Sequence, residues 1–169
     1  MKISEQEKQE LEELYHFFLT HEKTQKMKDV QMHRGSNTFL HSFKVAKLAI
    51  KRALRHKKVN LKAILVASIL HDYYLYDWRT EKQYKAHHAQ NHPFIAAENA
   101  KKDFGIDEEV MKIIQTHMWP FNIKRFPETK EARIVNFADN RIALKEALTS
   151  RAYKERHREK ELKFIEKLF

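Results

Sequence analysis

The sequence predicts an all-α protein. Only two glycines and three prolines occur among its 169 residues, too few for the tight turns that join the strands of a sheet. Leucine, alanine, glutamate, lysine and arginine, which favour helices, are abundant. The segment LKAILVASIL at residues 61–70 is apolar on every side, which is typical of a buried helix. The length suits one domain, which we expect to cover residues 1–169 with its centre at about 38–148.

Three helices are expected in the first half of the chain. Apolar residues recur at helical spacing from about residue 5 to 20 and predict an amphipathic helix. They are Leu11, Leu14, Tyr15 and Phe18. Serine or asparagine can cap a second helix, from about 38 to 56. Its inward residues are expected to be Phe39, Phe43, Ala46, Ile50 and Ala53. The buried helix, from 61 to about 72, comes third.

A long connection follows, rich in aromatic and histidine residues, from 73 to 91. Such a length within a compact domain usually forms a lid or a binding loop. We expect the next helix to begin at His92 and Pro93, because proline suits the first helical position. Gly105 is expected to end that helix.

Two or three more helices are expected near the C-terminus. Asp107 can cap a helix that continues to His117. After a second irregular stretch, a helix is expected from about 130 to 148. The last twenty residues are dense in charge, with a thin apolar stripe formed by Leu162, Ile165 and Leu168. We expect them to form a solvated helix face; contact with nucleic acid or with an oligomer partner is the alternative.

Composition limits the classes of function. The absence of cysteine excludes disulfides, thiolate metal sites and cysteine nucleophiles. The acidic, amphipathic start is unlike a signal peptide and no apolar run has membrane-spanning length, so we expect a cytoplasmic protein. The net charge of +10 suits anionic ligands such as nucleotides, nucleic acid or an acidic membrane surface. The net charge alone does not distinguish among these three kinds of ligand. The sequence does not indicate the oligomeric state.

The pair His71 and Asp72 ends the buried helix and needs a partner, because an unpaired buried carboxylate costs several kcal/mol or more. A metal ion suits both side chains. Three further residues lie on the apolar sides of other expected helices: His41, His117 and Asp139. A lone buried histidine is more often a satisfied core residue. Convergence of five such groups, two of them acidic, favours a metal site.

The order of these residues resembles that of the HD-domain superfamily of metal-dependent phosphohydrolases. The resemblance covers about residues 38–148 and rests on LHSFKVA around His41, SILHDYYLYDW around His71 and Asp72, and NFADN around Asp139. It implies an all-α bundle in which these four residues hold a metal ion, with His71 and Asp72 at the centre of catalysis.

Two more histidines suggest a second metal ion. His92 and His117 are similar in order and context to the extra histidines of bimetallic HD hydrolases, including the bacterial di-iron enzymes that cleave dinucleoside polyphosphates. The resemblance implies that Asp72 bridges the two ions and that these histidines complete the second site. The alternatives are that His92 merely caps its helix, or that His87 or His88 takes its place.

Ligand chemistry limits the choice of metal. Imidazole and carboxylate ligands disfavour soft ions and leave iron, manganese, zinc, cobalt and nickel. The resemblance favours one or two ions of iron or manganese. It implies attack on phosphorus by a water molecule that the ions activate.

The substrate is less well defined. Leu75 stands where many HD hydrolases carry a lysine, and the GYP element of the cyclic di-GMP enzymes is missing, so neither substrate assignment carries over. Cations and aromatic rings that could bind a phosphate or a base are nevertheless present. These candidates are His33, Arg34, Lys44, Arg79, Trp119, Lys124 and Arg125. As alternatives, Lys44 could be a solvated lysine and the tryptophans could close the bundle.

The resemblance and the charge together predict a phosphohydrolase that acts on a nucleotide or a small phosphorylated metabolite. The rival hypothesis is a basic module on the same scaffold that binds nucleic acid or a nucleotide without turnover. Salt-dependent binding without hydrolysis would favour that rival.

Overall fold

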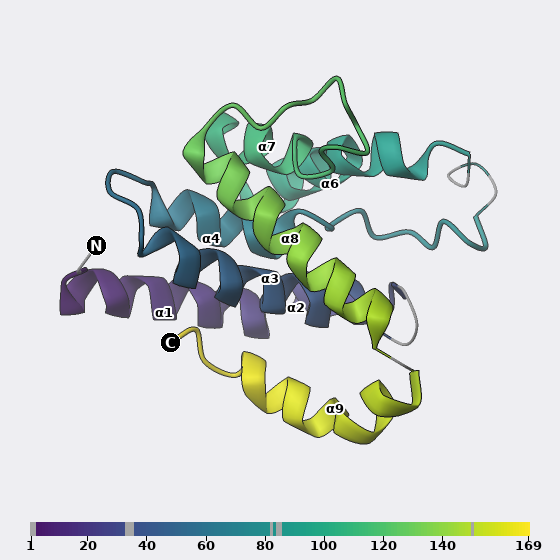
Figure 1. Ribbon diagram of the computed structural model, residues 1–169, viewed down its shortest axis with the longest axis horizontal. Coiled ribbons are helices and arrows are strands. Elements are labelled where there is room, and N and C mark those ends of the chain that lie inside the picture. The colour runs from purple at the N-terminus through teal and green to yellow at the C-terminus, as the bar shows by residue number, and fades with distance from the viewer. Residues whose placement is uncertain (1–2, 33–35, 82, 84–85, 150) are drawn as a thin grey trace.

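The computed structural model describes residues 3–32, 36–81, 83, 86–149 and 151–169. Within these ranges it contains helices and no β-strand, which confirms the predicted all-α class (Figure 1). In chain order the elements are α1 (Glu5–Thr20), α2 (Glu22–Gln25), the short 3-10 helix η1 (Lys26–Lys28), α3 (Thr38–Ala53), α4 (Leu61–Leu70), α6 (His88–Phe104), α7 (Glu108–Gln115), α8 (Lys130–Leu148) and α9 (Arg151–Ile165). None of the helices in these ranges is long and apolar enough to cross a membrane.

Polar side chains set the start of five helices. Each accepts a hydrogen bond from a backbone N–H of the first turn, which satisfies a donor that the helix itself leaves unpaired. The capping residues are Ser4, Asn37, Asn60, Asp107 and Thr129. The predicted cap of α7 by Asp107 is therefore confirmed, and of the two candidates before α3 the asparagine is the one that caps it.

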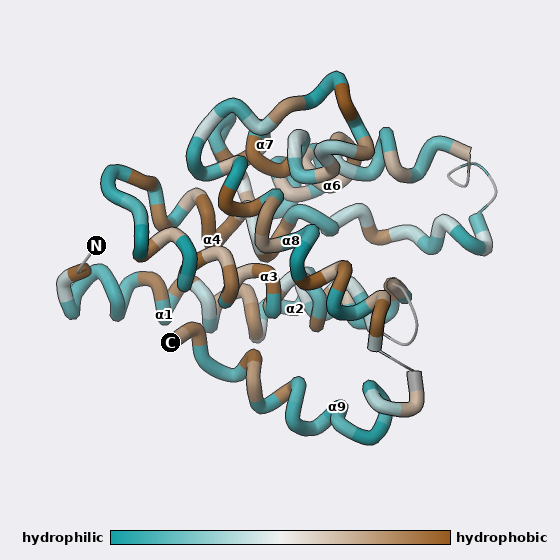
Figure 2. The backbone as a smooth tube through the Cα atoms, in the orientation of Figure 1, coloured by the Kyte–Doolittle hydropathy of each residue, from teal (hydrophilic) through white to brown (hydrophobic). Residues whose placement is uncertain are grey.

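The core lies around α4, which contacts α1, α3, α6, α7 and α8. Eight of its ten residues are buried, and Figure 2 shows hydrophobic segments gathered in α4 and its neighbours while α9 is largely hydrophilic. Burial of large aliphatic side chains such as Ile64 and Ile69 supplies about 1.5–3 kcal/mol each. The helix ends at Leu70, two residues before the predicted end, so that His71 and Asp72 lie in the turn that follows.

The start of α6 differs from the prediction. The helix begins at His88, and Pro93 lies inside it rather than at its first position. The carbonyl of His87 accepts hydrogen bonds from the N–H groups of Gln90 and Asn91, which closes the first turn ahead of the proline. Pro93 therefore removes only one later helical hydrogen bond, a cost that its burial helps to offset. The possibility that His92 caps its helix is also wrong, because this residue is in the second turn.

The C-terminal helix α9 is attached to α1. The hydroxyl of Tyr15 donates to the carbonyl oxygen of Ile165 at 2.7 Å, and Glu12 accepts the N–H groups of Leu168 and Phe169. Ile165 and Leu168 are buried, as expected for the apolar stripe, whereas Leu162 is 40% exposed. Most of the helix is solvated, so its apolar contact with the rest of the bundle is narrow.

Candidate metal centre

Six predicted metal-ligating residues come together in the centre of the bundle. They approach from five parts of the chain, and each is at most 8% exposed. His41 lies on α3, His71 and Asp72 follow α4, His92 lies on α6, His117 follows α7 and Asp139 lies on α8. Their role as metal ligands stays a prediction, but the fold brings all six into one cluster.

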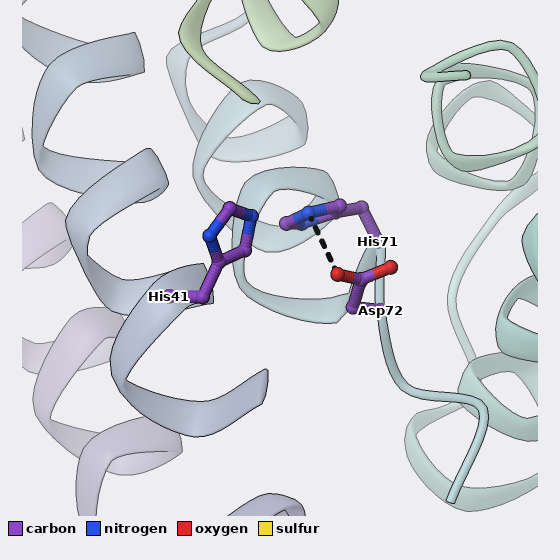
Figure 3. A group of neighbouring side chains, drawn as sticks. All are labelled: His41, His71 and Asp72. Atoms are coloured by element: carbon purple, nitrogen blue, oxygen red, sulfur yellow. Dashed lines mark ion pairs between the residues drawn. The ribbon is translucent and has the colours of Figure 1, made fainter. Parts of the chain in front are cut away.

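The first part of the cluster contains His41, His71, Asp72 and Asp139. Nε2 of His41 lies 3.0 Å from Oδ1 of Asp139. Nε2 of His71 lies 3.5 Å from Oδ2 of Asp72 and 3.6 Å from Oδ1 of Asp139. Figure 3 shows His41 reaching from α3 toward His71 and Asp72 at the end of α4. Four donor side chains thus surround one point of the interior.

The second part contains Asp72, His92 and His117. Oδ1 of Asp72 lies 3.3 Å from Nε2 of His92 and 3.7 Å from Nε2 of His117. The two Nε2 atoms are 3.0 Å apart. Because Oδ2 of Asp72 faces His71 while Oδ1 faces the other two histidines, this carboxylate is placed to bridge the two parts.

Three of the histidines have their tautomer fixed by a backbone carbonyl. A carbonyl oxygen only accepts hydrogen bonds, so the Nδ1 atom beside it must carry a proton and Nε2 presents a lone pair when the ring is neutral. These pairs are His71 with Ser68 at 2.8 Å, His92 with His88 at 2.9 Å and His117 with Ile114 at 2.7 Å. All three Nε2 atoms then face the centre of the cluster.

This arrangement fits a divalent metal ion. The Nε2 atom of His71 is buried and has no hydrogen-bond partner among the described residues. A buried polar atom without a partner destabilises the folded protein. The facing lone pairs of His92 and His117 repel unless a cation lies between them. Two donors that each lie about 2.1 Å from one ion are separated by about 3.0–3.5 Å, close to the distances observed. Within the described residues, three buried groups of histidine and aspartate meet this requirement: His41, His71 and Asp72; His71, His117 and Asp139; and Asp72, His92 and His117.

Glu146 supports the cluster, although it was not predicted from the sequence. This buried residue of α8 has Oε2 at 2.9 Å from Nδ1 of His41. A carboxylate at that position holds the proton on Nδ1 and leaves Nε2 for a metal ion. Glu146 lies seven residues, or about two helical turns, after Asp139. That spacing is the signal that would have placed both carboxylates on one side of the helix.

The carboxylates and histidines shift one another's pKa. Burial alone would lower the pKa of His41, but hydrogen bonds and charges from Asp139 and Glu146 raise it to about 10. Burial together with the charges of His71 and His92 lowers the pKa of His117 to about 3. Burial would raise the pKa of Asp72, but the positive charge of His71 and contacts with the other two histidines hold it well below its usual range. The carboxylates are therefore ready to bind a cation at neutral pH.

A column of stacked rings leads toward His92. The ring of Trp78 stacks on that of His88 with centroids 5.1 Å apart, and His88 stacks on His92 at 4.6 Å. Neither His87, which is exposed, nor His88 belongs to the metal-compatible groups found in the described residues. Of these three histidines, His92 is the one that the structure brings into the cluster.

Lys44 is not placed as predicted. It is buried, which contradicts a solvated lysine, and its Nζ pairs with Glu146 at 3.1 Å and with Glu161 at 2.8 Å. Glu146 contacts Nδ1 of His41, whereas Nε2 of the same ring faces the cluster. Lys44 binds Glu146 and therefore lies on the opposite side of the His41 ring from the cluster. Its positive charge is already matched by two carboxylates, so we correct its assignment from phosphate binding to support of Glu146.

The other predicted substrate residues lie in two loops. Arg79 is exposed and its guanidinium donates to the carbonyl oxygens of Gln31 and Met32, which joins the connection after α4 to the segment before α3. It is thus a bridge between loops, and its role in substrate binding stays a prediction. His33 and Arg34 lie outside the described residues.

The loop that follows His117 carries the remaining candidates. Trp119 is partly buried and its ring meets that of Phe126 with centroids 5.5 Å apart. The guanidinium of Arg125 lies 4.9 Å from the centre of the Phe94 ring on α6, and Lys124 is exposed. The backbone oxygens of His117 and Trp119 both accept from the side chain of Asn136 on α8. This loop is therefore attached directly beside the cluster.

Comparison with known proteins gives one match. The family model described as HD domain matches residues 38–144, which include all six clustered residues. No curated protein and no solved structure matches the chain.

Proposed function

The chain belongs to the HD domain family, and from this premise we propose that it is a metal-dependent phosphohydrolase that acts on a nucleotide or a related small phosphorylated metabolite. The family is one of metal-dependent phosphohydrolases, and its members bind divalent metals. We infer both the hydrolytic activity of this chain and its substrate class from the geometry and the charge of the cluster.

The observation that carries the proposal is the position of Asp72 between two sets of donors. His41, His71, Asp72 and Asp139 would hold a first divalent ion, and Asp72, His92 and His117 would hold a second. Nitrogen and oxygen donors suit iron or manganese, our preferred ions, as well as zinc, cobalt or nickel. Such ions lower the pKa of water and polarise phosphoryl oxygens, which is the chemistry of phosphate hydrolysis.

The charge of the cluster supports an anionic substrate. Asp72 and Asp139 neutralise only two of the four positive charges that two divalent ions would bring, since neutral histidines add none. The site would therefore attract phosphate. His41, held by Glu146, and the three histidines held by carbonyl groups keep the donors oriented before substrate arrives.

The loop after His117 supports a nucleotide over a simpler phosphate ester. Trp119 offers an aromatic face, and Lys124 and Arg125 offer positive charge in the same short segment. Stacking combined with charge suits a base and its phosphate groups. The overall net charge of +10 favours the same class of ligand.

The test is a screen of phosphorylated compounds with metal-loaded protein, in which released phosphate is measured. We expect metal-dependent release, with nucleotides among the better substrates. Asp72→Asn should lower kcat by at least about two orders of magnitude because it removes the bridging charge, whereas Arg125→Ala should mainly raise KM. Metal-loaded protein that hydrolyses no mono-, di- or polyphosphate ester, but binds nucleic acid with strong salt dependence, would favour the binding module instead.

A further inference from the structure

We propose that a second small-molecule site lies between α3, α8 and α9 and binds an amphipathic anion, that is, an apolar organic body with a carboxylate or phosphate head. A cavity of about 640 Å³ occupies this position. This volume lies within the range of about 300–1,000 Å³ that is usual for small-molecule sites. The site is independent of the proposed hydrolase activity.

The segment from α9 to the C-terminus is attached to the rest of the bundle at separate points, and the cavity lies beside them. Near the C-terminus, Tyr15 binds the carbonyl of Ile165 and Leu168 is buried. In its middle, Glu161 reaches Lys44 on α3. Figure 1 shows α9 crossing below α3 and α8, with its C-terminal end turning toward the bundle.

Apolar side chains make up the floor of the cavity. They come from all three helices and from the segment after α9, and they present aliphatic and aromatic surface without charge. The main ones are Leu48, Ile50, Leu54, Ile142, Phe164 and Leu168. The rings of Tyr153 and His157, stacked with centroids 4.0 Å apart, form one wall. Such a surface suits an acyl chain or an aromatic body more than a sugar.

The charged side chains of the lining are mostly positive. Six lysines and two glutamates line the cavity. Both glutamates, Glu146 and Glu161, are paired with the same lysine, Lys44. Lys51 and Lys145 are exposed on α3 and α8, and Lys160 is exposed on α9. The excess of lysine requires an anionic head on any ligand whose body enters the cavity.

The cavity does not open onto the metal centre. Glu146 and Lys44 form the wall between them, because Glu146 lines the cavity and also accepts from Nδ1 of His41. The Nε2 atom of His41 points away from this wall, toward Asp139. A ligand head in the cavity would have to displace Glu146 to reach the metal-facing atoms, so this is a separate site.

The test is calorimetric titration of the 169-residue protein with decanoate below its micelle concentration. Decyltrimethylammonium supplies the same chain with a positive head. The informative variant is the double substitution Lys51→Glu and Lys145→Glu. Its matched control is Lys112→Glu with Lys130→Glu, which reverses two exposed charges away from the cavity. Circular dichroism verifies that both variants fold.

We expect saturable binding of one decanoate per chain. Affinity should fall at least about tenfold in the Lys51→Glu and Lys145→Glu variant and stay unchanged in the control. The cationic probe should not bind. Absence of saturable decanoate binding, equal binding of the cationic probe, or equal loss of affinity in the control would overturn the proposal.

Discussion

Glu146 and His41 are 105 residues apart in the sequence, yet Oε2 of the glutamate lies 2.9 Å from Nδ1 of the histidine. Both side chains are buried. The contact places the proton of a neutral imidazole on Nδ1 and leaves Nε2 to face Asp139 and the rest of the cluster. Glu146 is therefore a positioning residue, which acts on the candidate metal centre through His41.

Glu146→Gln tests this role. The substitution keeps the size of the side chain but removes the charge that favours the correct tautomer, so the affinity for the first metal ion should fall by about 10- to 100-fold. Titration with Mn²⁺, followed by the signal of the free ion in electron paramagnetic resonance, measures this affinity. Glu128→Gln, in the exposed segment before α8, is the control. Equal affinity in wild type and Glu146→Gln would show that the contact is only structural.

Metal binding should release protons. In the metal-free protein the pKa of His41 is raised to about 10 by Asp139 and Glu146, so this ring carries two protons at pH 7.5. A metal ion needs Nε2 free of its proton, and one proton must leave. His117, with a pKa lowered to about 3, is already neutral and releases none.

The sign of the pH dependence follows from this competition. Affinity for the first ion should increase as pH rises toward 10, by about tenfold per unit for one proton, and decrease as pH falls. Calorimetry in buffers of different ionisation enthalpy counts the protons at pH 7.5. We expect at least one per chain in the wild type, and fewer in Glu146→Gln because the pKa of His41 is then lower. Zero released protons would contradict the assignment of His41 as a ligand.

Lys44 provides a prediction on stability. Lys44→Ala removes one of the two cationic partners of buried Glu146 and leaves it only His41. Loss of one partner from a buried pair costs about 3 kcal/mol. Lys62→Ala removes an ion pair of similar length to Glu10, but on the surface, where the lysine side chain is 62% exposed. We expect urea unfolding to show a large loss for the first variant and almost none for the second. Similar unfolding midpoints would contradict the buried pairing.

Much of the fold and the cluster was predictable because the signals are local. In α3, α7 and α8, apolar residues recur at helical spacing behind a capping side chain, and α4 is apolar on every side behind its own cap. His41 and Asp139 are polar residues on otherwise apolar sides of such helices, so they could be assigned to the interior. The convergence of all six residues required the family resemblance, since helical spacing does not say how helices pack.

The errors have equally physical causes. The first turn of α6 lacks a capping side chain among the described residues, and Pro93 suggests a later start than the one observed. The partners of Lys44 lie 102 and 117 residues away, so its burial depends on where α8 and α9 pack. No local pattern contains that information.

A bridged pair of metal ions gives a distinct prediction for His92 and His117. In protein loaded with Mn²⁺, exchange coupling between two ions joined by Asp72 should appear in the electron paramagnetic resonance spectrum. His92→Ala and His117→Ala should each give the spectrum of an isolated ion, because the residues proposed to hold the first ion, His41, His71, Asp72 and Asp139, are unchanged. His87→Ala, in an exposed neighbour outside the cluster, is the control. Coupling that persists in both His92→Ala and His117→Ala would mean that these histidines do not hold the second ion.

The most direct test of the metal centre is the metal content of the purified protein. The protein is prepared without chelators, freed of any histidine tag, and supplied in turn with iron, manganese, cobalt, nickel and zinc. We expect one to two equivalents of a first-row transition metal in the wild type, and loss of the first ion in His71→Ala and Asp72→Ala. Protein that folds normally and stays free of metal with every one of these ions would contradict the central claim.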